Sequence, residues 1–203
     1  MSHYSDKHYF ASDDYDRFYY GILFKKGSKI LDIGCSTGNF AAQDHKNIVG
    51  VDIDADAIKI AKKRGLNAFQ HDITKKLPFN SNSIDNVHCR HVLEHMKGPL
   101  FLMKDIFRIL KKNGRLVLMT DRMTDRFWDD YTHQKPFTKK SLEQLAYDAG
   151  FRKCRVYEFP SRGVFGVGFL YKHKLLSPAS AKRIYELFGR LFRTDGILLD
   201  AIK

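Results

Sequence analysis

The sequence predicts an α/β fold, in which helices cover both faces of a mostly parallel sheet. Apolar runs typical of strands alternate along the chain with segments of helical periodicity. The first two apolar runs, at 29–33 and 48–52, also carry carboxylates near their ends, Asp32 in the first run and Asp52 in the second. Alternation of this kind is typical of parallel strands joined by crossover helices.

Five further strands are predicted from apolar runs, at 67–70, 84–89, 115–120, 155–159 and 197–202. Helices are predicted from about residue 38, from Asp54, over 99–110 and over 141–150. Acidic residues in the first turn favour a helix start after Asp54. A glycine commonly closes a helix, which places the end of the last of these helices at Gly150.

A glycine-bounded loop follows the first predicted strand. Gly34 and Gly38 can adopt positive φ values and allow a ligand to approach the backbone, because they lack a Cβ atom. Such a loop beneath a helix start is a common cofactor site in open α/β sheets. Asp52 follows 18 residues after Gly34 at the tip of the second strand, where a carboxylate can bind ribose hydroxyls.

Six segments in order resemble the class I S-adenosylmethionine-dependent methyltransferase family, in particular its type 11 members. These segments are 32–38, Asp52, 71–73, 77–88, 91–95 and 109–118. Two positions depart from the family pattern. Ser36 stands where many members have glycine, and Asn113 where many have proline or glycine.

The resemblance implies a Rossmann-like sheet of seven strands with the last strand antiparallel. It implies S-adenosylmethionine as the cofactor, with S-adenosylhomocysteine as the product. It also implies a set of cofactor-binding residues at successive strand ends, namely Asp32, Gly34, Cys35, Gly38, Asp52, Ile53, Asp72, Ile73 and Arg90. Cys35 is expected to serve in this loop as a small packing residue rather than as a nucleophile.

A nicotinamide dinucleotide is the rival cofactor. Its fingerprint, G-x-G-x-x-G, requires glycine at the positions that Ser36 and Asn39 occupy here. An α/β domain whose glycine turn binds nothing is the other alternative.

The resembled family binds its methyl acceptor over the C-terminal ends of strands four and five, and its catalysis is mainly alignment of an in-line displacement. An acceptor with a high pKa also needs a base. His91 and His133 are the candidate catalytic bases, because the pKa of histidine lies near neutrality. Asp121 and Arg122, at the end of the fifth strand, could orient the acceptor.

A metal site is a further alternative, although none is assigned. His91, Glu94 and His95 have the i, i+3, i+4 spacing of one helical face, and His133 could complete the set. The arrangement resembles a Glu-x-x-Glu-His pattern of magnesium-assisted small-RNA and some quinone-pathway methyltransferases. With histidine in the first position, zinc or iron would suit the set better than magnesium.

Composition indicates an intracellular protein. The first residues contain no apolar core of a secretory signal, and three widely spaced cysteines favour free thiols, so a cytoplasmic location is expected. The net charge is +12, and residues 150–203 contain 11 Lys and Arg against 4 Asp and Glu. This bias is typical of proteins with an anionic partner or of a lysine-rich solubilising surface.

The whole chain, 1–203, is expected to be a single methyltransferase domain. Residues 1–25 would form a helical cover across the cofactor mouth, and residues 160–195 a basic helical insertion between strands six and seven. The insertion contains an amphipathic helix with an apolar stripe at Ile184, Leu187, Phe188 and Leu191. This stripe is expected to pack on the sheet, with peripheral membrane or acidic-partner contact through 163–193 and a homodimer as alternatives.

The function predicted from these observations is methyl transfer from S-adenosylmethionine to an oxygen or nitrogen atom. The expected acceptor is a small molecule, a lipid-linked compound or a glycan precursor. Two alternatives stay open: an RNA methyltransferase, which the basic charge favours, and a non-catalytic cofactor-binding partner subunit.

Overall fold

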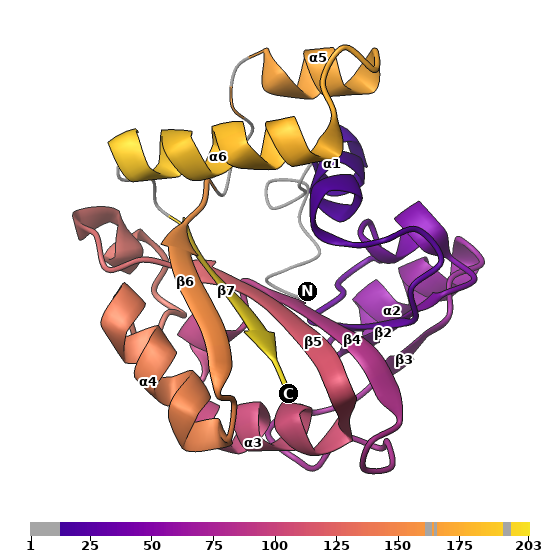
Figure 1. Cartoon of the computed structure of the whole chain (residues 1–203). Helices are drawn as coiled ribbons and strands as arrows, with labels where there is room; N and C mark the ends of the chain where they lie inside the picture. The colour runs from indigo at the N-terminus through magenta and orange to yellow at the C-terminus, as the bar shows by residue number, and fades with distance from the viewer. Residues whose placement is uncertain (1–12, 161–163, 165, 193–195) are drawn as a thin grey trace.

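Seven strands form one mixed sheet, which confirms the predicted α/β class (Figure 1). The computed structural model describes residues 13–160, 164, 166–192 and 196–203. The strands are β1 (Ile30–Ile33), β2 (Ile48–Asp52), β3 (Ala68–Gln70), β4 (Ile84–Arg90), β5 (Leu110–Asp121), β6 (Lys153–Glu158) and β7 (Gly196–Ile202). Their order is β3-β2-β1-β4-β5-β7-β6, with β7 antiparallel to both neighbours. The strand order therefore reverses between β1 and β4, which is where open α/β sheets bind ligands.

Helices cover both faces of the sheet. One face carries α1 (Asp13–Leu23) and α2 (Ala55–Lys63), and the other carries α3 (Pro99–Ile109) and α4 (Lys139–Ala149). On the side of α1 lie α5 (Val167–Lys172) and α6 (Pro178–Phe192), which contact α1 and each other. Three short 3-10 helices complete the described elements: η2 (Ala41–Asp44), η3 (Leu93–His95) and η4 (Asp125–Asp129).

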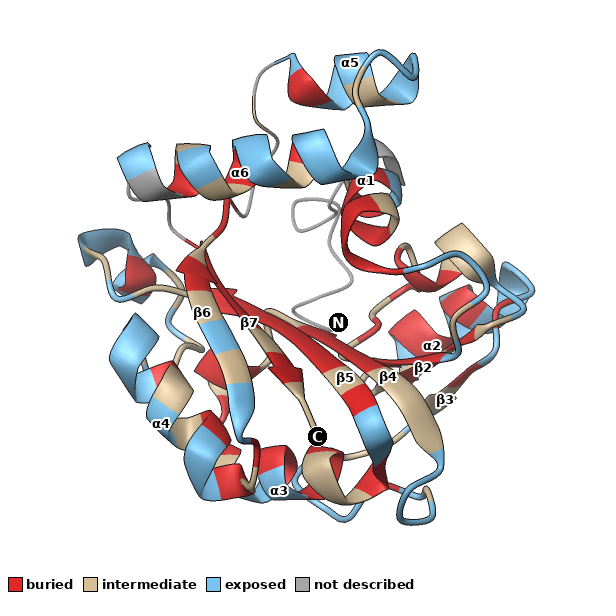
Figure 2. Cartoon of the chain, in the orientation of Figure 1, coloured by how far each residue is buried: buried red, intermediate tan, exposed pale blue. Residues whose placement is uncertain are grey.

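The sheet separates two apolar cores, as the buried central strands in Figure 2 show. Successive side chains of a strand point to opposite faces. In β1, Ile30 therefore packs in the core beneath α1, while Leu31 and Ile33 pack in the core beneath α3. Burying one such side chain contributes about 1.5–3 kcal/mol, so the two cores hold the strand ends in fixed positions.

Two of the predicted helix ends are confirmed by their caps. The Asp54 carboxylate accepts hydrogen bonds from the backbone N–H groups of Asp56 and Ala57, which starts α2. Gly150 ends α4 with a left-handed φ of 115°.

The helix predicted from about residue 38 is wrong. Within the described segment 34–47, the structure has only the short 3-10 helix η2. Gly38 has a φ of 85°, which cannot begin a right-handed helix, and β2 starts at Ile48. The segment between Gly38 and β2 has room for one short 3-10 helix.

The prediction for the apolar stripe of α6 is also wrong. Ile184, Leu187 and Leu191 are exposed, whereas Ala181 and Tyr185 are buried in the core. The helix is therefore rotated so that its small and aromatic positions pack inward and its aliphatic stripe faces outward. Residues 1–12 of the predicted cover, and residues 161–163, 165 and 193–195 of the predicted insertion, lie outside the described residues.

The insertion leaves and rejoins the sheet at the edge where the parallel strands end. Glu158, the last residue of β6, is paired with Ile197, and Asp121, the last residue of β5, is paired with Gly196. Figure 1 accordingly shows α5 and α6 beyond this edge of the sheet. Among the described residues, none of the helices has the length and apolar character needed to cross a membrane.

Candidate functional site

The loop after β1 is built on two glycines that no other residue could replace without strain. Gly34 and Gly38 have φ values of 75° and 85°. A Cβ atom at Gly34 would clash with the side chain of Val92, and one at Gly38 would clash with Leu66. Ser36 lies between them with a φ of 48°, which explains why glycine is common at this position of the family pattern.

Asp52 links this loop to the end of β2. Its Oδ2 atom accepts the Ser36 N–H at 2.7 Å, and its Oδ1 atom accepts the Asp54 N–H at 2.9 Å. Burial raises the pKa of the Asp52 carboxyl, although these two hydrogen bonds act in the opposite direction. The carboxylate is thus fixed at the strand tip with its remaining lone pairs available to hydroxyl donors.

The tip of β3 and the residues after it lie beside Asp52. β3 pairs with β2, and the backbone N–H of His71 donates to the Asp52 carbonyl at 2.8 Å. Ile53 is 59% exposed at this edge, which is unusual for a large apolar side chain. The Asp72 carboxylate accepts the N–H and the hydroxyl of Thr74, and Ile73 packs against the adjoining core. An exposed apolar surface next to fixed carboxylates fits a nucleoside.

Cys35 packs inside the loop. The Cys35 thiol is buried, and its Sγ atom lies 2.6 Å from where a Cβ of Gly50 would be. Burial raises the pKa of this thiol, so it stays protonated at neutral pH. Only the backbone of Cys35 is available to a ligand in this geometry.

Two of the predicted cofactor-binding residues, Asp32 and Arg90, have ion-pair contacts to other side chains of the protein. Asp32 is buried, and its Oδ1 atom lies 2.6 Å from Nδ1 of His88. Arg90 forms an ion pair with the fully buried Asp16 at 2.6 Å. The Arg90 guanidinium also lies over the rings of Tyr15 and Tyr19.

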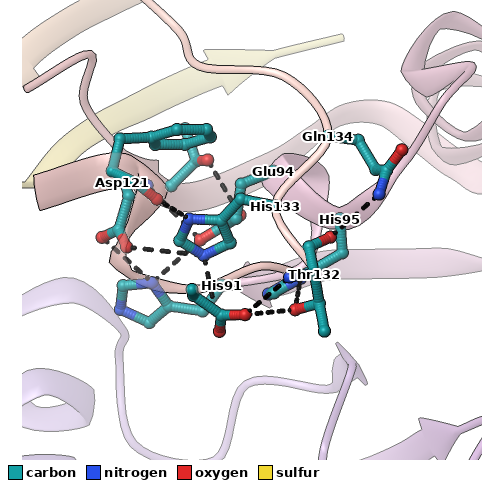
Figure 3. Close-up of polar contacts among 10 residues, drawn as sticks. His91, Glu94, His95, Asp121, Thr132, His133 and Gln134 are labelled. Carbon is teal, nitrogen blue, oxygen red and sulfur yellow. Dashed lines mark hydrogen bonds and ion pairs between the residues drawn. The ribbon is translucent and has the colours of Figure 1, made fainter.

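A second group of polar residues gathers where β4 and β5 end, and Figure 3 shows it in close-up. Its centre is Glu94 in η3, which is fully buried. The Glu94 carboxylate accepts the Thr120 hydroxyl at 2.8 Å and lies 3.0 Å from Nδ1 of His91. Burial acts to raise the pKa of Glu94, but the His91 hydrogen bond and charge outweigh it, so the pKa is lowered and Glu94 is ionised.

His91 contacts two carboxylates of this group. Burial acts to lower its pKa, but the hydrogen bond and negative charge of Glu94, together with Asp121, raise it overall. The distance from Nδ1 of His91 to Oδ1 of Asp121 is 3.4 Å. His91 has a left-handed φ of 52° and precedes η3, so the prediction that His91, Glu94 and His95 share one helical face is wrong.

His133 presents a basic nitrogen to the same place. Its Nδ1 atom lies 2.6 Å from the Phe127 carbonyl oxygen, which can only accept a hydrogen bond. Nδ1 therefore carries the proton, and in the neutral ring Nε2 has a free lone pair. Nε2 lies 4.0 Å from a carboxylate oxygen of Asp121 (Figure 3). It also lies 3.9 Å from a carboxylate oxygen of Asp130.

His95 is held as a neutral ring beside His133. The Thr132 hydroxyl donates to the Asp130 carboxylate at 2.6 Å and therefore accepts from Nδ1 of His95 at 3.0 Å. Burial lowers the pKa of His95. The centroids of the His95 and His133 rings are 4.8 Å apart.

The residues weighed as metal ligands are divided between two groups that share Glu94. The first consists of Glu94, His95 and His133, and the second of His91, Glu94 and Asp121. Both carboxylate oxygens of Glu94 already accept hydrogen bonds from protein groups. We therefore assign no metal to either group.

Several contributors to this site were missed from the sequence. Asp130 and Thr132 have the i, i+2 spacing at which an aspartate accepts a nearby hydroxyl and N–H, so local turn chemistry could have indicated them. The Phe127 carbonyl could not have been found, because a backbone acceptor leaves no trace in residue identity.

Comparison with protein families identifies a methyltransferase domain. The model of the family described as "Methyltransferase domain" matches residues 3–156, which is most of the chain. An uncharacterized protein of Methanocaldococcus jannaschii is 32% identical over 127 residues, covering 62% of this chain and 58% of that protein. A ubiquinone biosynthesis O-methyltransferase of Psychrobacter arcticus is 26% identical, covering 63% and 60%. The chain thus spans about three-fifths of the length of these curated relatives.

Solved structures share the fold over nearly all of the chain. A SAM-dependent methyltransferase from Archaeoglobus fulgidus superposes with a TM-score of 0.70 at 22% identity, covering 95% of both chains. Phosphoethanolamine N-methyltransferase 2 of Haemonchus contortus, solved with S-adenosyl-L-methionine, superposes with a TM-score of 0.66 at 19% identity, covering 94% of this chain and 52% of that one.

Proposed function

Because this chain belongs to the class I S-adenosylmethionine-dependent methyltransferase family, we propose that it transfers a methyl group from this cofactor to an oxygen or nitrogen atom of its acceptor. The acceptor we propose is a small molecule, a lipid-linked compound or a glycan. The single observation that carries this proposal is the free Nε2 lone pair of His133 at the ends of β4 and β5. A base at that place is what a hydroxyl or amine acceptor requires.

The residues at the ends of β1 to β3 fit the cofactor. Gly34 and Gly38 leave room beside the loop, Asp52 offers carboxylate lone pairs for ribose hydroxyls, and Ile53 with Ile73 offers apolar surface for the adenine. Asp72 adds a carboxylate at the third strand tip. When bound, the sulfonium cofactor supplies an electrophilic methyl group.

His133 acts as the base in this proposal. Nε2 of His133 takes the proton of the acceptor hydroxyl or amine, while Nδ1 keeps the ring oriented through Phe127. The carboxylates of Asp121 and Asp130, both about 4 Å from Nε2, stabilise the imidazolium that results. In this proposal, Nδ1 orients the ring of His133 and Nε2 reacts with the acceptor.

His91 serves a different purpose from His133. The hydrogen bond and the negative charge of Glu94 favour the protonated ring and raise the pKa of His91, so this ring is better suited to donate a hydrogen bond than to take up a proton. We assign it to orienting the acceptor as a hydrogen-bond donor. Glu94, through Thr120 and His91, holds the ends of β4 and β5 in register around the acceptor.

Two observations bear on the acceptor. One relative is a ubiquinone biosynthesis O-methyltransferase, which supports an oxygen atom of a small, lipid-soluble compound. The net charge of +12 favours RNA as the second candidate.

Transfer of a radiolabelled methyl group into a fractionated cell lysate tests the proposal. Label in the low-mass or lipid fraction, lost in a His133→Asn variant, is the expected result. Label in RNA would replace the proposed acceptor by the second candidate. Cofactor binding by calorimetry without transfer into any fraction would instead indicate a non-catalytic partner subunit.

A further inference from the structure

Helix α6 packs on the protein with only one of its faces. Ala181, Tyr185 and Gly189 form this face, and the first two are fully buried. A Cβ atom at Gly189 would clash with the Glu158 carbonyl, so the helix backbone lies directly on the end of β6. This close contact fixes which side of α6 faces outward.

The outward side of α6 and the neighbouring α5 expose large apolar side chains. Leu187 and Leu191 are 56% and 65% exposed, and Phe169 and Leu175, in and after α5, are 63% and 70% exposed. In Figure 2, much of the ribbon of both helices is correspondingly coloured as exposed. Exposed apolar groups gathered on neighbouring elements mark an interaction site more often than solitary ones do.

The same two helices are cationic. Residues 166–192 contain five Lys and Arg and one acidic residue, Glu186. Glu186 is already paired with Arg155 at 2.8 Å, so its charge is largely compensated. Lys174 and Arg183 are exposed beside the apolar side chains. We define the α5–α6 surface as Phe169, Lys174, Leu175, Arg183, Leu187 and Leu191.

We propose that the α5–α6 surface docks on an anionic lipid bilayer, lying in its interface. An anionic bilayer binds protein surfaces on which apolar side chains are flanked by Lys and Arg. The apolar side chains enter the boundary of the acyl chains, and the Lys and Arg side chains pair with the anionic headgroups. A second copy of this chain would bring two surfaces of equal positive charge together, which disfavours a dimer through this face. Since the described helices are too short or too polar to span, docking would be peripheral.

The position of the α5–α6 surface determines which part of the protein docking would bring close to the bilayer. The insertion is anchored where Glu158 and Asp121 end their strands, and Asp121 belongs to the His133 group. Docking would therefore place the carboxyl edge of the sheet near the bilayer, where a lipid-linked acceptor lies. This consequence rests on the proposed function, whereas docking itself does not.

Sedimentation with vesicles tests docking without any turnover. The probes are vesicles of pure phosphatidylcholine and vesicles of an equimolar mixture of phosphatidylcholine and phosphatidylglycerol. We expect the protein to bind the anionic vesicles and to be released by high salt, because exposed charges are screened. Leu187→Asn with Leu191→Asn should lower the partition coefficient roughly tenfold or more. Lys174→Glu with Arg183→Glu should lower it by about 25-fold or more.

Matched substitutions elsewhere serve as controls. Phe101→Ser replaces an exposed apolar residue of α3, and Lys112→Glu reverses an exposed charge near the start of β5. Both should leave vesicle binding unchanged. Asp52→Asn should also leave it unchanged while weakening cofactor binding, which separates docking from the proposed function.

Three results would overturn the proposal. The first is equal binding of the charge-reversed variant and the unaltered protein to anionic vesicles. The second is binding of RNA, but not of vesicles, that is lost in the charge-reversed variant. The third is a dimer in sedimentation equilibrium that the two leucine substitutions dissociate.

Discussion

The Nδ1 atom of His133 lies 2.6 Å from the carbonyl oxygen of Phe127. Because that oxygen has no proton to give, the contact sets the tautomer of the ring and leaves Nε2 as its basic nitrogen. The same contact fixes the segment after η4 relative to η4 itself. His133 thus has a structural bond on one nitrogen and a free lone pair on the other, and substitutions can separate the two.

His133→Asn is expected to remove activity while keeping the fold. The asparagine amide can still donate to Phe127, but it offers no basic nitrogen at the Nε2 position. We expect kcat to fall by about 10²–10⁴, the usual contribution of a general base, with little change in melting temperature. Methyl-transfer kinetics together with thermal unfolding measure the two effects.

His133→Ala provides the comparison, because it loses both functions of the ring. It should show the same loss of kcat together with a loss of stability of about 1–3 kcal/mol from the unpaired carbonyl. His45→Ala, at an exposed histidine after η2, should change neither quantity. An Asn variant with undiminished kcat would show that His133 is not the base.

The His91–Glu94 pair predicts a specific pH dependence of stability. The pKa of His91 is raised above 6.5, so its contribution is complete below pH 6.5 and is lost as the pH rises through the raised value. The pKa of Glu94 is lowered from 4.5, so its contribution is complete above pH 4.5 and is lost as the pH falls through the lowered value. The pair therefore stabilises most between pH 4.5 and 6.5.

Urea unfolding of the protein and of His91→Asn at several pH values measures this dependence. Asparagine tolerates the left-handed backbone at this position. The stability difference between the two should shrink from pH 6.5 to pH 9, by less than about 1 kcal/mol because part of the His91 ring faces solvent. A difference that grows with pH over this range would contradict the raised pKa of His91.

Alanine substitutions at two glycines test how tightly the cofactor loop is packed. Gly34→Ala introduces a methyl group that clashes with Val92, in addition to the strain of a left-handed alanine. We expect a loss of roughly 3 kcal/mol or more in the free energy of unfolding. Gly27→Ala has a similar φ of 80° but open space around it, so only about 1–2 kcal/mol should be lost there.

A second substitution tests the cause of this loss. Val92→Ala combined with Gly34→Ala removes the clashing methyl group and should recover part of the stability in a double-mutant cycle. Equal losses at Gly34 and Gly27 would mean that backbone strain alone is responsible and that the loop has room beside Val92.

The sequence predicted the sheet well because its signals are local. Apolar runs and glycine turns mark strands and loops wherever they occur, so the positions of the strands were predicted from the residues, and the antiparallel last strand from the family pattern. Rotation of a helix is decided by its neighbours. For α6, the backbone contact between Gly189 and Glu158 determines that the leucine stripe faces outward, and no periodicity in the helix itself contains that information.

Only part of the candidate site was predicted: its two histidines were expected, but Asp130, Thr132 and the pairings were not. His91 and His133 were both expected as bases, since residue type alone cannot show which group each ring contacts. The two rings differ because His91 lies beside the Glu94 carboxylate and His133 beside the Phe127 carbonyl. Similarly, Asp32 and Arg90 occupy positions typical of cofactor contacts, but the structure pairs them with His88 and Asp16.

Asp52→Asn should weaken cofactor binding. Asp52 uses both carboxylate oxygens to accept backbone N–H groups, and an amide can replace only one of them. With the charge for ribose hydroxyls also lost, we expect an affinity about tenfold lower or worse, measured by calorimetry. Asp56→Asn, at an exposed aspartate of α2, should leave the affinity unchanged. An unchanged affinity in Asp52→Asn would remove this residue from the cofactor site.

Substitutions in the ion pair between Asp16 and Arg90 test the role of Arg90. Asp16 is fully buried, so Asp16→Ala leaves the Arg90 cation without its partner and should reduce the free energy of unfolding by about 3–5 kcal/mol. Replacing both, Asp16→Leu with Arg90→Met, removes the uncompensated charge and should restore most of this stability.

Cofactor titration of the double variant then separates anchoring from binding. If Arg90 serves mainly to hold α1 against the end of β4, the affinity of the double variant stays within about threefold of the unaltered protein. A loss of tenfold or more, about 1.4 kcal/mol, would return Arg90 to the cofactor-binding set that the sequence predicted. The guanidinium lies against Tyr15 and Tyr19 as well as Asp16, so three contacts from α1 already occupy it, and we expect the smaller effect.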